Sequence, residues 1–147
     1  MSRLLFLALI ILPCFSFSQS CSDLIISEYC EGSGSNRAIE LYNPTADAIN
    51  LSSYTLQRYS NGSNNATDEL QLEGVVEPYG TWVVVNGQTE DIDLGGGSIS
   101  WAADPLIQAY ADQLGNPYPD PLYMNGDDAL MLVKDGNIIV DIFGKPG

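Results

Sequence analysis

The chain has 147 residues, of which 19 are acidic, five are basic and none is histidine, and its formal net charge is −14. Without histidine, the sequence excludes Ser-His and Cys-His nucleophilic triads and nuclease sites that use a histidine base. The excess of carboxylates also argues against direct binding of nucleic acid, because the affinity of proteins for nucleic acid depends largely on Lys and Arg contacts with phosphate.

The N-terminal residues have the order of features that is typical of a secretory signal peptide. Arg3 supplies a positive charge, residues 4–14 (LLFLALIILPC) form an apolar run, and small polar residues follow. A transmembrane helix needs about 20 apolar residues, so this run is too short to span a membrane. We expect cleavage after Ser18, with Ser20 as the alternative. The sequence therefore predicts a secreted or cell-surface protein without a transmembrane segment.

Residues 19–147 have the length of one domain. All 19 acidic residues but only four basic ones lie beyond residue 20, which leaves this part with a formal charge of −15. Two cysteines, Cys21 and Cys30, also lie there. In an oxidising compartment such a pair predicts a disulfide, with two free thiols or an intermolecular role as the alternatives. A lipid anchor on Cys14 or Cys21 is an alternative to simple cleavage, although neither follows a small-residue lipobox.

Short apolar or alternating segments, separated by turn residues, predict a series of β-strands along the mature chain. The expected strands are residues 24–29, 38–42, 49–51, 54–59, 70–72, 81–85, 129–133 and 138–143. Asp135 and Gly136 predict a tight hairpin between the last two. One short helix is expected at residues 103–114, with Asp104 as its N-cap and Pro105 as its first residue. Seven or eight short strands with closely spaced turns predict an all-β fold, an Ig-like β-sandwich.

Several short motifs follow one another in a characteristic order along this part of the chain. They are LIISEY at 24–29, AIELYNP at 38–44, LSSYTL at 51–56, the strand around Trp82, NGDDAL at 125–130 and KDG at 134–136. Together they resemble the lamin tail domain in the form found in secreted bacterial proteins, and this resemblance implies an Ig-like β-sandwich. Domains of this family usually continue to a closing strand, whereas this sequence stops at Gly147. We therefore expect a fragment of a longer protein, or a sandwich that lacks an edge strand.

The resemblance also bears on function, since such domains in secreted bacterial proteins look like accessory modules beside hydrolases or in surface proteins. The family implies no catalytic residues, so we assign none. We expect a non-catalytic extracellular module that binds or tethers, with a protein or a cell-envelope glycan as its partner and no required cofactor. The alternative is an N-terminal accessory domain of an extracellular nuclease or other hydrolase whose catalytic part lies beyond residue 147.

One polar turn near the C-terminus is a candidate calcium site. Asn125, Asp127 and Asp128, with Asp120 or Asp104 from the preceding loop, offer the oxygen ligands that Ca²⁺ prefers. The competing interpretation is a turn in which the aspartate side chains accept hydrogen bonds from nearby backbone N–H groups. The sequence leaves both interpretations open.

Two further sets of residues have a functional and a simpler interpretation. Glu28 and Glu40 lie in expected strands, and they could work as the carboxylate pair of a glycoside hydrolase only if they faced each other. The aromatic residues could form a sugar-stacking face, whereas core and cross-strand packing is the simpler interpretation. These aromatic residues are Tyr29, Tyr42, Tyr54, Tyr59, Tyr79, Trp82 and Trp101.

Overall fold

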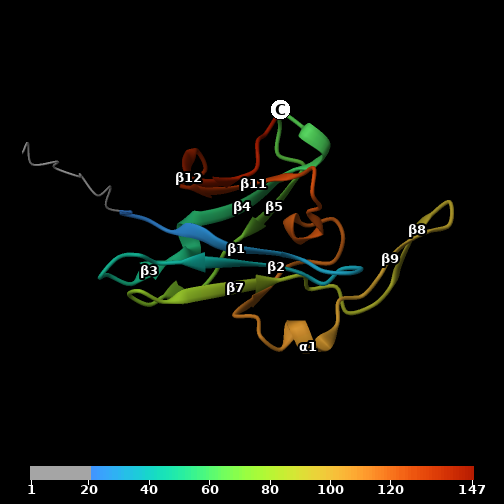
Figure 1. Cartoon of the computed structure of the whole chain (residues 1–147), viewed down its shortest axis with the longest axis horizontal. Helices are drawn as coiled ribbons and strands as arrows, with labels where there is room; N and C mark the ends of the chain where they lie inside the picture. Colours follow the sequence, from blue (N-terminus) through green and yellow to red (C-terminus); the bar gives the residue numbers. More distant parts are fainter. Residues whose placement is uncertain (1–20) are drawn as a thin grey trace, which may run out of the picture.

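The computed structural model describes residues 21–147, so the predicted signal peptide and its cleavage site lie outside the described residues. In the described part, two four-stranded sheets form the two layers of a β-sandwich (Figure 1). The first sheet has the order β1 (Ile25–Glu31), β2 (Arg37–Tyr42), β7 (Thr81–Val85) and β10 (Gln113–Leu114). The second has the order β12 (Ile138–Phe143), β11 (Ala129–Lys134), β4 (Tyr54–Tyr59) and β5 (Asp68–Gln71). The predicted all-β sandwich is confirmed.

Two small strand pairs complete the set of described strands. They are β3 (Ile49–Asn50) with β6 (Val75–Val76), and β8 (Ile92–Gly95) with β9 (Ser98–Ser100). The β8–β9 hairpin was not expected from the sequence, and it extends away from the body of the sandwich (Figure 1). With it the described strands number 12, more than the seven or eight expected, because several of them are only two to four residues long.

The only α-helix in residues 21–147 is α1 (Pro105–Gln108), which is shorter than the expected span of 103–114. Its N-terminus is as expected, because the side chain of Asp104 accepts a hydrogen bond from Leu106 N at 2.9 Å. The helix cannot continue because Asp112 bonds the backbone of Val83 in both directions and draws β10 alongside β7 in parallel. None of the described helices is long and apolar enough to cross a membrane.

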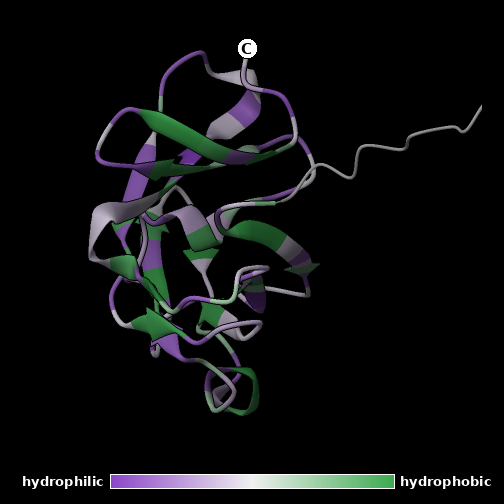
Figure 2. Ribbon diagram, turned by 90° about the vertical axis from the view of Figure 1, so that its left-hand side faces the viewer, coloured by the Kyte–Doolittle hydropathy of each residue, from purple (hydrophilic) through white to green (hydrophobic). Residues whose placement is uncertain are grey.

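The core between the sheets is built from the alternation of the strand sequences. In β4, Tyr54, Leu56 and Arg58 are buried while the residues between them are more exposed. Figure 2 shows apolar and polar residues interleaved along the strands in this way. The fully buried side chains come from both sheets, from Leu72 directly after β5 and from the segment before β11, and they include Ile39, Leu41, Leu56, Val84, Leu122, Met124, Leu130 and Leu132.

A bulge in β1 decides which of its residues face the core. Ile26 pairs with Leu41 and Glu28 pairs with Glu40, so Ser27 has no partner across the ladder. The extra residue changes the alternation, so that Ile26 and Tyr29 both pack against the core. Strict alternation would have put these two side chains on opposite faces.

The edge strand β12 lies beside β1 and joins the two sheets at one side of the sandwich. Ile26 N donates to the carboxylate of Asp141 at 2.7 Å, and the rings of Tyr29 and Phe143 stack with centroids 4.4 Å apart. Both contacts link strands of different sheets. The expectation that the chain is a fragment of a longer protein, or a sandwich that lacks its closing strand, stays a prediction.

A cluster around Asp23 anchors the chain just before β1. Its carboxylate accepts hydrogen bonds from the Tyr54 hydroxyl at 2.5 Å and the Lys134 ammonium at 3.0 Å. Burial raises the pKa of Asp23, but these two bonds and one from Leu24 N outweigh it and hold the pKa below 3.8. The ionised form of Asp23 is therefore favoured by folding.

Candidate functional site

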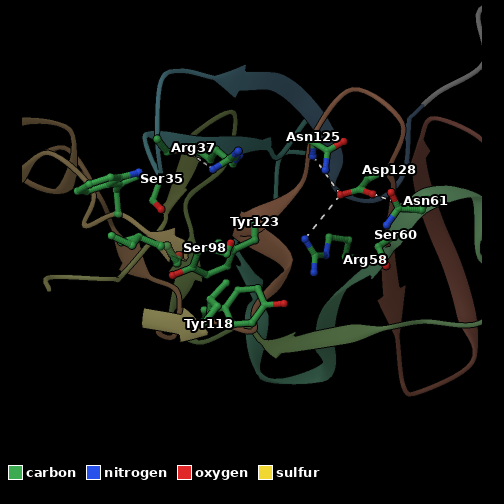
Figure 3. A pocket seen from close by; sticks show the side chains of 15 residues that line it. Ser35, Arg37, Arg58, Ser60, Asn61, Ser98, Tyr118, Tyr123, Asn125 and Asp128 are labelled. Carbon is green, nitrogen blue, oxygen red and sulfur yellow. Dashed lines mark hydrogen bonds and ion pairs between the residues drawn. The ribbon is translucent and has the colours of Figure 1, made fainter. Parts of the chain in front are cut away.

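An open cleft of about 520 Å³ lies where four separate segments of the chain meet. The β1–β2 turn, the end of β4, the β8–β9 hairpin and the segment before β11 all contribute lining residues. Ligand pockets in proteins commonly have volumes of about 300–1,000 Å³ and combine apolar walls with a few polar groups. The size and position of this cleft make it the candidate site of the described chain (Figure 3).

One side of the cleft holds a buried ion-pair network that maintains the fold. Arg58 pairs with Asp68 and lies 3.6 Å from the carboxylate of Asp128, whose side chain is 0% exposed. Asp128 also accepts hydrogen bonds from the backbone N–H of Asn61 at 2.9 Å and of Asn125 at 3.0 Å. Figure 3 shows Asp128 joined to Arg58, Asn61 and Asn125 by dashed lines. Since the guanidinium is paired with both carboxylates, this side offers no unpaired cation to a ligand.

The second arginine of the cleft, Arg37, has few partners. Its Nη1 donates to the carbonyl oxygen of Gly34, while its Nε is buried and without a hydrogen-bond partner. The ion pairs of the described chain do not include it. Its register partner across the ladder, Glu31, accepts instead from the Tyr29 hydroxyl at 3.2 Å. Arg37 is therefore the one cationic group of the cleft that forms no ion pair within the described chain.

Apolar and aromatic side chains form the opposite wall of the cleft. Trp101 is 53% exposed, and Leu94 and Ile99 on the β8–β9 hairpin are also exposed. Tyr118 is exposed as well, and its ring meets Tyr123 edge-on at 5.1 Å between centroids. Exposed aromatic rings in a concave site offer flat surfaces on which the C–H face of a sugar can stack.

A buried polar network holds the floor of the cleft in place. The Tyr123 hydroxyl donates to the side-chain oxygen of Gln88, and Gln88 Nε2 donates to the carbonyl of Ser100 at 2.6 Å. Asn86 accepts from Gln88 N at 2.9 Å and donates to the carbonyl of Leu122 at 2.9 Å. These bonds connect the hairpin to the segment before β11, so the wall and the floor of the cleft are held together.

The structure gives separate structural roles to two of the four predicted calcium ligands, Asp120 and Asp128. Asp120 accepts from Leu122 N and Asn116 N, each at 2.9 Å, and burial raises its pKa. Asp128 belongs to the ion-pair network, whereas Asp127 is exposed. In residues 21–147, no three acidic, cysteine or histidine side chains are grouped so that they could hold a metal ion. The contacts of Asp120 and Asp128 match the turn interpretation, and calcium binding stays a prediction without geometric support.

The remaining sequence candidates lie outside the cleft or in the core. Cys21 and Cys30 are exposed free thiols in the structure, and their oxidation stays a prediction. Glu28 and Glu40 are direct partners across β1 and β2, next to a cavity of only about 70 Å³. That volume is too small for a sugar ring with its catalytic water.

The aromatic set from the sequence does not form one face. Tyr54 is buried and Trp82 packs against the core, while Trp101 alone of that set lines the cleft. Sequence reasoning did not assign Arg37 to the site, although Arg37 is one of only four basic residues beyond residue 20. That rarity in an acidic chain was the available signal.

The two sheets and their strand order define an Ig-like β-sandwich, a fold class that generally serves as a non-catalytic module. A model of the lamin tail domain matches residues 18–146, so this chain belongs to the lamin tail domain family. A search of curated proteins found no match.

Proposed function

We propose that this chain is a non-catalytic extracellular binding module, and that it holds a glycan of the cell envelope in the cleft beside Trp101. Export is supported by the signal-peptide pattern of residues 1–18, and the non-catalytic role by the family. The module would keep whatever protein it belongs to at a glycan surface.

The observation that carries the proposal is the composition of the cleft. Trp101 is more than half exposed, and polar side chains line the same cavity, among them Ser98 from β9 and Ser35 and Asn61 from two other segments. A protein leaves a large aromatic ring in such a place at a cost, because burying that ring would be favourable. An aromatic surface surrounded by hydroxyl and amide groups suits a sugar, whose faces are apolar and whose edges carry hydroxyl groups.

The shape of the cleft favours a glycan over a protein partner. A stable protein interface buries about 800 Å² on each side and is centred on a well-packed apolar core. The cleft is instead a concave site of about 520 Å³ whose lining is largely polar. A short stretch of a sugar chain fits that space.

A binding experiment with two matched variants tests the proposal. The purified protein is applied to a panel of immobilised neutral and acidic oligosaccharides, and the Trp101→Ala and Tyr110→Ala variants are compared with the unchanged protein. Tyr110 is 80% exposed and does not line the cleft, so it controls for the loss of an exposed aromatic ring. We expect at least about tenfold weaker binding for Trp101→Ala only. Absence of binding to every glycan, or an equal loss in both variants, contradicts the proposal.

A further inference from the structure

We infer that the glycan of the cleft carries a carboxylate, as a uronic acid does, and that this carboxylate pairs with the guanidinium of Arg37. The inference rests on the proposed function and adds the chemical class of the ligand. It depends on what Arg37 has and has not bonded within the protein.

Arg37 has unused hydrogen-bonding capacity. An arginine side chain has five N–H donors, and the structure pairs one nitrogen of Arg37, Nη1, with the carbonyl of Gly34. The Nε donor is buried and unpaired. A ligand in the cleft cannot reach that buried atom. Nη2, in contrast, has no hydrogen-bond partner in the described chain and is not buried, so a carboxylate in the cleft can accept N–H bonds from the Nη1–Nη2 end of the guanidinium.

The absence of an ion pair at Arg37 is unusual in so acidic a protein. The chain has 19 acidic residues, yet none of them forms an ion pair with Arg37 among the described residues. Arg58, in the same cleft, pairs with Asp68 and Asp128. Although the protein has many carboxylates, only Arg58 of the two cleft arginines is therefore ion-paired in the described chain, and Arg37 is not.

The position of Arg37 suits a charged sugar rather than a free anion. The turn that carries its partner Gly34 lies beside Trp101, since a Cβ added to Gly34 would be 3.7 Å from Cβ of Trp101. In Figure 3 the side chains of Arg37, Ser35 and Ser98 lie around the same part of the cavity. A sugar ring stacked on Trp101 would therefore lie in the same cavity as the guanidinium and the two hydroxyl groups.

The charge of the protein limits the charge of the ligand. A formal charge of −15 beyond residue 20 repels polyanions over distances up to the Debye length, about 8 Å in physiological salt. Within the cleft, one guanidinium is available and can neutralise one carboxylate. A sugar chain with isolated uronic acids meets both conditions better than a doubly charged phosphate.

The test compares a glucuronic-acid-containing oligosaccharide that has a single carboxylate with the same oligosaccharide after methyl esterification. The two probes differ at one group only, where the ester has lost the charge and gained a methyl group. We expect the acid form to bind the unchanged protein at least about tenfold more tightly than the ester, as a charge-assisted bidentate pair implies. We expect this preference to disappear in Arg37→Met. The matched control is Lys145→Met, which removes the same charge at an exposed position outside the cleft.

Thermal unfolding separates a binding role from a structural role for Arg37. Methionine keeps the apolar stem of the side chain and removes the unpaired Nε donor. We expect Arg37→Met to melt at the same temperature as the unchanged protein or higher, while it loses the preference for the acid. A melting temperature that falls together with binding would overturn the inference, because it would make Arg37 a structural residue.

The outcomes distinguish the inference from the proposed function. Equal binding of acid and ester, with Trp101→Ala still defective, overturns the inference and leaves the glycan site standing. Binding of neither probe, nor of any other glycan, overturns both. Tighter binding of a sugar phosphate, or of a peptide with one glutamate, shows that Arg37 selects another anion and overturns the uronic acid assignment.

Discussion

Replacing Asp128 with Asn should destabilise the protein far more than the same change at its neighbour Asp127. The Asp128 side chain is fully buried and accepts two backbone N–H bonds at 2.9 and 3.0 Å, with Arg58 at 3.6 Å. Asparagine has nearly the same shape, but it lacks the charge and turns one acceptor oxygen into an NH₂ donor. Asp127 is exposed, so its replacement changes the net charge equally without touching these contacts.

The size of the effect follows from the contacts that are lost. A hydrogen bond to a charged group contributes about 1.5–3 kcal/mol, and breaking a buried ion pair costs about 3–5 kcal/mol. Arg58 keeps its pairing with Asp68, which places the expected loss for Asp128→Asn near the lower end, at about 3–4 kcal/mol. For a domain of this length that corresponds to a fall in melting temperature of roughly 10–20 °C.

Thermal and urea unfolding of the two variants, followed by circular dichroism, measures the difference. If Asp128→Asn and Asp127→Asn melt within about 2 °C of each other, the buried network does not stabilise the fold and our reasoning is wrong. The same melts in millimolar Ca²⁺ and in a chelator test the calcium hypothesis. We expect no shift, because both oxygens of Asp128 are already bonded. A shift of several degrees that disappears in Asp127→Asn would support a calcium site.

Two further predictions concern the core and the pH dependence. Gly74 has a φ of +100° and a Cβ there would clash with the Trp82 ring, so Gly74→Ala should lower the free energy of unfolding in urea by about 2–4 kcal/mol. Gly96 also has a positive φ, +63°, but open space around it, so Gly96→Ala should lower that free energy by only about 1–2 kcal/mol. Because the folded pKa of Asp23 lies below 3.8, its contribution is present above that pH and is lost as the pH falls through the folded pKa. Asp23→Asn should therefore flatten the stability curve below about pH 4, and a curve that stays parallel to that of the unchanged protein would contradict this.

Local sequence predicted the regular strands of the sandwich closely. The strands β4, β7 and β12 begin and end at the residues expected from alternation and turn signals. The turn between the last two strands also has the predicted character, since Asp135 and Gly136 both have positive φ. Such features depend on residues a few positions apart, and a sequence shows these directly.

Other elements were decided by partners far along the chain. The predicted helix ends early because Gln113 and Leu114 pair with β7 as a parallel strand. The β8–β9 hairpin is poor in apolar alternation and turns through three glycines with positive φ, so no strand signal marked it. Its polar and glycine-rich segments gain their pairing only when the hairpin closes.

In the candidate site, too, some features were predictable from local sequence and others depended on distant residues. The sequence identified Asn125 and Asp128 as an unusual polar turn, but the groups that bond Asp128 include the backbone of Asn61, 67 residues earlier. Calcium and structural use require the same residue types, so composition could not choose between them. What separates them is whether the carboxylate oxygens are already bonded, which is a property of the folded chain.

By itself, the sequence determined the all-β class, the family resemblance and the acidic character of this protein, because alternation, turn residues and charge are local or additive properties. Only the tertiary structure decided that Arg58 is neutralised while Arg37 stays open, and that Trp101 rather than Trp82 reaches the cleft. Those outcomes depend on which strands pair and in which register. Strand pairing and the loops that join the strands place residues far apart in sequence within contact distance, and this determines which charges meet and which aromatic rings are buried.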